Sequence, residues 1–144
     1  MVGLLVTGHG HFATGLGSAF ELIAGSAENI VFVDFEADHS TEILTDNLNK
    51  ALDQLKNYDG VLVLADLAGG SPFKTAVECK VARQEQPIEV IAGTNLAMLI
   101  EGFVIAESYE NPLDMSNALI PVGKDGVVLF EQKDHEDNEE EDGI

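Results

Sequence analysis

The sequence predicts a single doubly wound α/β domain, with a mostly parallel central sheet of about five strands and helices on both faces. Short apolar runs of strand length alternate with helical stretches, as in parallel sheets whose strands are joined by crossover helices. The first run, residues 2–7, is apolar without alternation, which is typical of a central strand covered on both faces. The chain has 144 residues, 45% of them apolar, which is enough for one domain with a sizeable core.

The first half of the chain contains three predicted strands and two predicted helices. The strand over residues 2–7 stops at Gly8-His9-Gly10, where two glycines allow a sharp turn. A helix is then predicted over 14–24, a second strand over 29–35, a helix after the capping residue Ser40, and a third strand over 61–65 that ends before Asp66. The helix after Ser40 is predicted from an apolar stripe at helical spacing: Leu44, Leu48, Ala51, Leu52 and Leu55.

The second half begins with a strong helix signal. Ser71 followed by Pro72 has the pattern of a cap and a first helical position, so a helix is predicted from Pro72 to about Gln84, before Pro87. The remaining elements are expected in this order: a strand over 88–92, a turn at 93–95, a helix over 96–107, a short helix from 111, a turn at 121–124 and a fifth strand over 126–130.

The composition changes after residue 130. Residues 1–130 form the predicted domain, whereas residues 131–144 contain eight acidic residues and one lysine. This tail has too few apolar side chains for their burial to offset the entropy lost on ordering. We expect this acidic tail to be disordered. The whole chain carries a net charge of −19 with only 7 basic residues, which argues against binding nucleic acid or an anionic membrane surface and leaves a basic protein partner open.

The sequence also indicates a compartment. Cys79 is the only cysteine, so an internal disulfide and a cysteine-based metal cluster are excluded. No apolar run reaches transmembrane length, and no basic segment precedes the first apolar run as it would in a signal peptide. We expect a cytoplasmic protein.

Candidate site residues gather at one edge of the predicted sheet. Right-handed crossovers bring the carboxyl ends of parallel strands to the same edge, where ligands bind in open α/β sheets. His9, Asp66, Ser71 and the turn at 93–95 all fall there. If the first and third strands are neighbours, as in the flavodoxin-like order, His9 and Asp66 face each other.

These residue types fit a covalent phosphohistidine site. A neutral imidazole is a good nucleophile near neutral pH, and Asp66 is placed to orient its other ring nitrogen. Ser71 lies at a predicted helix start, and backbone N–H groups near Gly10 and Gly70 would complete a cradle for an anion. The alternative is a capped turn with a solvent-exposed histidine.

Other ligand classes have less support. The Gly69-Gly70-Ser71 turn lacks the lysine of a Walker loop, and no G-x-G-x-x-G follows the first strand, so we expect no nucleotide cofactor. A metal site built from His9, His11 and Asp66 lacks further convergent ligands, so we expect no metal. His11 is interpreted as a loop side chain that could tune the site, and His39 as a solvated loop residue.

Four segments resemble one known family. They read LLVTGHG at 4–10, VFVDF at 31–35, VLVLADLAGGSPF at 61–73 and VIAGTNLAML at 90–99. Together they resemble the IIA component of the mannose family of the bacterial phosphoenolpyruvate-dependent sugar phosphotransferase system, over roughly residues 1–130. The stretch TGHGHFATGL resembles the N-acetylgalactosamine/galactosamine branch more than the mannose branch.

The resemblance implies a cytoplasmic phosphocarrier. His9 would accept a phosphoryl group from phospho-HPr and pass it to the matching IIB component, with Asp66 orienting the ring and Ser71 contacting the phosphoryl group. The sugar would pass through the membrane components IIC and IID, so this chain would meet the membrane only indirectly. The resemblance also implies a homodimer, in which the strand over 126–130 crosses to the partner and pairs antiparallel.

Two other functions remain open from the sequence. A phosphohistidine-carrying subunit of a dihydroxyacetone kinase has a related fold but reads Ser-His-Ser where this chain reads Gly8-His9-Gly10. A non-catalytic flavodoxin-like binding module would bind a ligand without forming phosphohistidine. The chain departs from its relatives at Thr7-Gly8, and at His11 and Ala68, where the mannose-specific member has aromatic residues.

Overall fold

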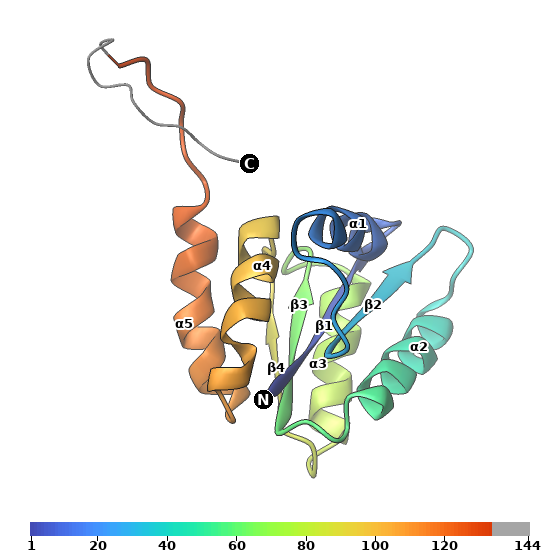
Figure 1. The fold of residues 1–144 in the computed structure, drawn as a ribbon. Helices are drawn as coiled ribbons and strands as arrows, with labels where there is room; N and C mark the ends of the chain where they lie inside the picture. The colour runs from blue at the N-terminus through green and yellow to red at the C-terminus, as the bar shows by residue number, and fades with distance from the viewer. Residues whose placement is uncertain (134–144) are drawn as a thin grey trace.

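Four strands form one parallel sheet in the order β2-β1-β3-β4 (Figure 1). The computed structural model describes residues 1–133. In the described part of the chain the strands are β1 Val2–His9, β2 Ile30–Phe35, β3 Gly60–Ala65 and β4 Ile88–Ile91. β1 therefore lies between β2 and β3, as the flavodoxin-like order predicts, and its carboxyl end is flanked on both sides.

Helices cover both faces of the sheet, as predicted for a doubly wound fold (Figure 1). α1, α4 and α5 pack on one face, and α2 and α3 pack on the other. Their bounds are α1 Phe12–Ala24, α2 Thr41–Gln54, α3 Ser71–Ala82, α4 Leu96–Ile105 and α5 Pro112–Asp125, with a single 3₁₀ turn, Ala106–Ser108, after α4.

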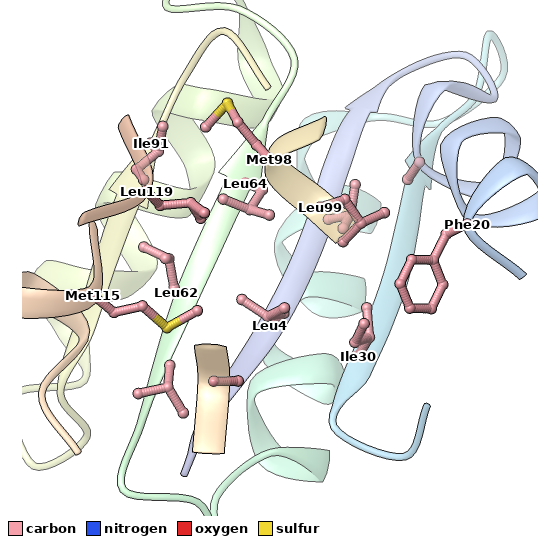
Figure 2. Packing of buried hydrophobic residues seen from close by; sticks show 14 residues of the cluster. Leu4, Phe20, Ile30, Leu62, Leu64, Ile91, Met98, Leu99, Met115 and Leu119 are labelled. Atoms are coloured by element: carbon pink, nitrogen blue, oxygen red, sulfur yellow. The ribbon is translucent and has the colours of Figure 1, made fainter. Parts of the chain in front are cut away.

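The apolar pattern of β1 is explained by its two buried faces. Leu4 and Val6 belong to the core on the α1 side, whereas Leu5 belongs to the core on the α2 side, because side chains of a strand alternate between faces. Figure 2 shows the first of these clusters, which includes Leu4, Phe20, Ile30, Leu62, Leu64, Ile91, Met98, Leu99, Met115 and Leu119. Burial of apolar side chains on both faces of the sheet holds β1, the strand that carries His9, in place.

The carboxyl-terminal prediction was wrong in two places. The predicted turn at 121–124 lies inside α5, and Pro121 is tolerated there because it is on the exposed face of the helix, where water can satisfy the carbonyl that it leaves unbonded. The predicted fifth strand over 126–130 is not a strand, and within residues 1–133 the sheet has four. Gly126 caps α5, and the segment after it leads away from the domain (Figure 1).

A strand needs a hydrogen-bonding neighbour, and the segment over 127–130 pairs with none of the four strands of its own chain. Its exchange with a partner subunit stays a prediction. Most of the acidic tail, residues 134–144, lies outside the described residues. In the portion that is described, no helix is long and apolar enough to span a bilayer.

Candidate active site

The candidate site is built at the carboxyl edge of the two central strands. His9 is the last residue of β1, and Asp66 directly follows the last residue of β3. Thr7 pairs with Ala65 in the register between these strands, so the two functional side chains leave neighbouring strand ends. The structure thus brings His9 and Asp66 together.

His9 and Asp66 make two hydrogen bonds. The Nδ1 atom of the His9 ring lies 2.8 Å from Oδ2 of Asp66, and the His9 main-chain N–H donates to the same oxygen at 2.9 Å. The other carboxylate oxygen accepts from the Leu67 N–H at 2.8 Å. Because a carboxylate is an acceptor, Nδ1 carries the proton and Nε2 of His9 is the unprotonated nitrogen of the neutral ring.

These bonds also set the charge of Asp66. Partial burial by itself would raise the pKa of Asp66, whose side chain is only 9% exposed. The hydrogen bonds from the His9 main chain, the His9 ring and the Leu67 N–H outweigh burial and lower that pKa below its ordinary value. Asp66 is therefore a fixed anion that holds the ring in one orientation.

The reactive face of the His9 ring lies against Gly70. A Cβ atom added to Gly70 would stand 2.8 Å from Nε2 and 2.7 Å from Cε1 of His9, closer than real Cβ contacts allow. Gly70 also has φ = 93° and ψ = 174°, a backbone conformation that is essentially restricted to glycine. Gly70 thus combines close approach to the ring with a backbone that other residues rarely adopt.

Gly70, not Ser71, precedes α3 as its cap. The sequence predicted Ser71 as the capping side chain, but Ser71 is the first helical residue, and the N-cap makes no side-chain hydrogen bond. The first intrahelical bond of α3 runs from the Lys74 N–H to the Gly70 carbonyl, so the N–H groups before Lys74 precede the helical ladder. These donors and the positive end of the helix dipole lie beside the Gly70 backbone that faces His9.

The Gly10 amide has a partner already. Its N–H donates to the Phe35 carbonyl at 2.7 Å, in an isolated antiparallel bridge just beyond the parallel pairing of β1 and β2. A phosphoryl contact from this amide would require that bond to open. The contact from Gly10 therefore stays a prediction, as do those from Gly70 and Ser71.

The surroundings of His9 combine access with apolar contact. The ring is 47% exposed and packs edge-on against Phe35, with centroids 6.1 Å apart. Leu67, next to Asp66, is 50% exposed. A half-open ring beside a half-buried phenylalanine and an exposed leucine suits reaction with a group presented by another protein better than enclosure of a small substrate.

A second imidazole–carboxylate pair lies at the same edge, and it was missed from the sequence. Nδ1 of His11 lies 3.1 Å from Oδ2 of Asp34, a residue of β2. Asp34 also accepts from the main-chain N–H of Thr14 at 3.0 Å and from its hydroxyl at 2.6 Å. The available signal was a lone carboxylate in the otherwise apolar stretch VFVDF at 31–35.

The side chains considered as metal ligands fall into two separate pairs. Asp66 binds His9, whereas His11 binds Asp34. In the described part of the chain, His11, Asp34 and Glu36 have polar atoms within 4.8 Å of one another, close enough to surround a cation. Both oxygens of Asp34 already accept hydrogen bonds, which hold His11 and Asp34 together without an ion.

His39 is less exposed than the sequence suggested. Its side chain is 23% exposed, and Nδ1 accepts the Glu36 N–H at 3.1 Å across the turn after β2. The prediction of a solvated loop histidine was therefore wrong in part, because this ring supports a turn.

Comparison with known proteins identifies the family. Residues 3–118 match the EIIA-man family, described as the PTS system fructose IIA component. The chain belongs to this family. It is a mannose-family IIA component of a sugar phosphotransferase system, as the sequence segments predicted.

Individual relatives agree with this assignment. The mannose-specific EIIAB component of Escherichia coli K12 is 30% identical over 132 residues, which cover 92% of this chain and 40% of that protein. The IIA chain thus spans two fifths of this relative. The sorbose-specific EIIA component of Lacticaseibacillus casei is 30% identical over 105 residues, 73% of this chain and 74% of that protein.

Solved structures share the fold. An EIIA phosphotransferase component from Streptococcus agalactiae superposes with a TM-score of 0.82 at 31% identity, covering 89% of this IIA chain and 96% of that one. The mannose/sorbose-specific IIA subunit from Enterococcus faecalis has a TM-score of 0.77 at 28% identity, covering 92% and 96%. The relatives carry names of different sugars, so the amino-sugar branch stays a prediction for this IIA component.

Proposed function

We propose that this chain accepts a phosphoryl group from phospho-HPr on Nε2 of His9 and transfers it to the matching IIB component during sugar uptake. The observation that carries the proposal is the bond between Nδ1 of His9 and Asp66, at 2.8 Å. It leaves Nε2 as the nucleophilic nitrogen, directed to the Gly70 side of the site.

In the chemical step His9 is the nucleophile and Asp66 holds its ring. The lone pair of Nε2 attacks the phosphorus of the donor's phosphohistidine, a bond from Nε2 to phosphorus forms, and the donor's nitrogen–phosphorus bond breaks, leaving its electron pair on the donor imidazole. The proton on Nδ1 of His9 stays between the ring and Asp66, whose anion stabilises the positive charge that the ring gains. Transfer to IIB is the same step with the roles reversed.

Charge stabilisation is assigned to the start of α3. In phosphoryl transfer the phosphorus lies in line between the two nitrogens, and negative charge is spread over its three equatorial oxygens. Fixed donors to these oxygens lower the barrier more than flexible ones do. The donors proposed for this role are the N–H groups of Ser71 and Phe73 and the Ser71 hydroxyl, which follow Gly70 in the first turn of α3, before the Lys74 N–H begins the helical ladder. Asp66 keeps the ring aligned with them.

The deciding experiment is a minimal relay with detection by intact mass. Phosphoenolpyruvate, enzyme I and HPr are mixed with the wild type, with His9→Ala and with His39→Ala, a histidine from the same edge of the sheet. We expect one acid-labile phosphoryl group on the wild type and on His39→Ala, and none on His9→Ala. Absence of phosphate from the wild type would overturn the proposal.

Onward transfer separates the two phosphohistidine functions. The phosphorylated chain is presented either to a IIB component or to a dihydroxyacetone kinase. Loss of phosphate to IIB supports sugar uptake, which the family assignment favours, whereas loss only to the kinase would replace it.

A further inference from the structure

Two histidine–aspartate pairs stand side by side at the carboxyl edge of the sheet. Asp66 holds Nδ1 of His9 at 2.8 Å from the β3 side, and Asp34 holds Nδ1 of His11 at 3.1 Å from the β2 side. The side chains of Asp66 and Asp34 are 9% and 10% exposed, so both carboxylates are fixed and nearly enclosed. The phosphocarrier step proposed above uses only the first pair.

The second pair is anchored to the same backbone. Asp34 pairs with Gly8 in the register between β2 and β1, one residue before His9. His11 follows His9 by two residues, so their Cα atoms are at most about 7 Å apart. The hydrogen bonds from Thr14 to Asp34 tie the start of α1 to β2, which holds the pair in place.

Asp34 does not need His11 for its structural role. The carboxylate accepts from Thr14 in the first turn of α1, where a capping side chain would normally bond, and His11 at the N-cap position makes no such bond. Burial tends to raise the pKa of Asp34, but the hydrogen bonds from Thr14 and His11 lower it. Asp34 is thus a stable anion that caps α1 through Thr14 and also forms a hydrogen bond with the His11 ring.

The surroundings favour the protonated form of His11. The hydrogen bond to Asp34 is the main cause of a raised pKa for His11, and the charges of Glu36 and Asp34 add to it. Asp34 on β2 and Glu36 after β2 are the charged groups acting on this ring. With Nδ1 bonded to Asp34, the free N–H is the one on Nε2, and the side chain is 73% exposed.

A cation here has a particular use. The chain carries a net charge of −19 with 7 lysines and arginines, so a phosphoryl dianion approaches an acidic molecule. We propose that His11, held by Asp34, is a positioning residue that supplies local positive charge for the phosphoryl group arriving at His9. This proposal rests on the proposed function, because it concerns the same transfer step.

The test compares rates of transfer from phospho-HPr between variants, by rapid-quench intact mass. His11→Gln removes the charge, His11→Lys keeps it, and Lys56→Gln is the matched control. Lys56 is an exposed residue between α2 and β3, at the opposite edge of the sheet from His11. The Lys56→Gln substitution therefore removes one positive charge far from the site.

We expect His11→Gln to be roughly three- to eightfold slower than the wild type near pH 6.5, as for one charge acting on a dianion about 7–12 Å away in a water-like medium. Its rate should also fall less with added salt. Lys56→Gln should retain the wild-type rate.

The pH profile tests the charge itself. A raised pKa means that His11 is protonated at low pH and loses its charge as pH rises through that pKa. The ratio of wild-type to His11→Gln rates should therefore decline towards one at high pH, while His11→Lys stays faster than His11→Gln, because lysine remains charged to about pH 10.

Equal rates for His11→Gln and wild type, equal slowing by Lys56→Gln, or a ratio independent of pH would each overturn the role of His11. All three results would leave phosphorylation of His9 intact. A wild type that takes no phosphate from HPr would instead remove the proposed function on which this inference rests.

Discussion

The ring of His9 and the backbone of Gly70 are so close that no side chain fits between them. The contact places Nε2 at the amino-terminal end of α3 and leaves the rest of the ring half exposed. A substitution at Gly70 therefore acts on the reactive nitrogen directly.

We predict that Gly70→Ala slows phosphorylation at least tenfold per folded molecule. The new Cβ would stand 2.8 Å from Nε2 of His9, so the ring must move away from α3 or remain shielded. The left-handed backbone of Gly70, with φ = 93°, adds a cost to stability of about 1–3 kcal/mol. Intact-mass rates, corrected for the folded fraction by circular dichroism, measure both effects.

Gly69→Ala is the matched control for that variant. A Cβ at Gly69 would meet only Leu67, at 3.7 Å, an ordinary contact. It should phosphorylate at the wild-type rate. If both alanine variants react equally fast, the contact between Gly70 and the His9 ring has no part in the transfer.

The positions of site residues were predictable only where a single strand end was enough to locate them. His9 and Asp66 each end an apolar run, so their edge and their proximity followed from the alternating pattern and one assumption about strand order. The bond between His11 and Asp34 depends on the register of β1 with β2, which pairs Gly8 with Asp34. No local pattern encodes that register, so Asp34 was visible as an unusual residue but had no assigned partner.

At the scale of elements, Asn95 connects two helices as well as capping one. Its Oδ1 accepts the Met98 N–H at 3.0 Å at the start of α4, and its Nδ2 donates to the Gly123 carbonyl in α5 at 2.9 Å. The carbonyl of Asn95 also begins the α4 ladder by accepting from Leu99. Asn95 thus ties α4 to α5.

We predict that Asn95→Ala lowers the free energy of unfolding by about 2–3 kcal/mol, since it removes both a cap and a partly buried bond to a carbonyl. Ser40→Ala removes only a cap, on the Ile43 N–H at 3.1 Å, and should cost about 1 kcal/mol. Urea titrations of the two variants at one pH give the comparison. Equal costs would show that the bond to Gly123 contributes nothing to stability.

Element types were predicted well from periodicity, and the differences from the structure have local causes. The third helix begins at Ser71 because Gly70 adopts a left-handed conformation and takes the cap position. α5 continues through Pro121 because that residue faces solvent. The Ser71-Pro72 pattern alone does not specify the backbone angles of Gly70, and the presence of Pro121 alone does not show that this residue lies on the exposed face of its helix.

At the scale of the whole molecule, four consecutive apolar residues are left uncovered after α5. Val127, Val128, Leu129 and Phe130 are 79–84% exposed. β4 is an edge strand, so its outer hydrogen-bonding side is open to another strand. Val127 lines a hollow of about 280 Å³ next to β4, together with Ile91 and Met98. The sequence alone assigned this segment to a strand because it has strand composition, but within residues 1–133 it pairs with no strand of its own chain.

We predict that the wild type is a homodimer and that Leu129→Asp combined with Phe130→Asp converts it to a monomer. Two charges on the segment would prevent burial of its apolar side chains against a partner subunit. Light scattering after size-exclusion chromatography measures the mass. Leu22→Asp, at a site in α1 that is 90% exposed, is the control and should stay dimeric. A monomeric wild type would contradict the prediction.

His9 forms two hydrogen bonds with Asp66, one through its ring and one through its main-chain N–H, and only the first depends on the imidazole. The carboxylate accepts from the main-chain N–H of His9 and from the Leu67 N–H, and neither bond depends on the imidazole. A chain without the imidazole therefore keeps its surface and its anion while losing the only group that transfers phosphate in our proposal. Such a chain would act as a competitive inhibitor of the relay, because it would bind the phosphoryl donor and the acceptor without transferring phosphate between them. Its effect on sugar uptake in a cell would grow with its copy number relative to the intact carrier.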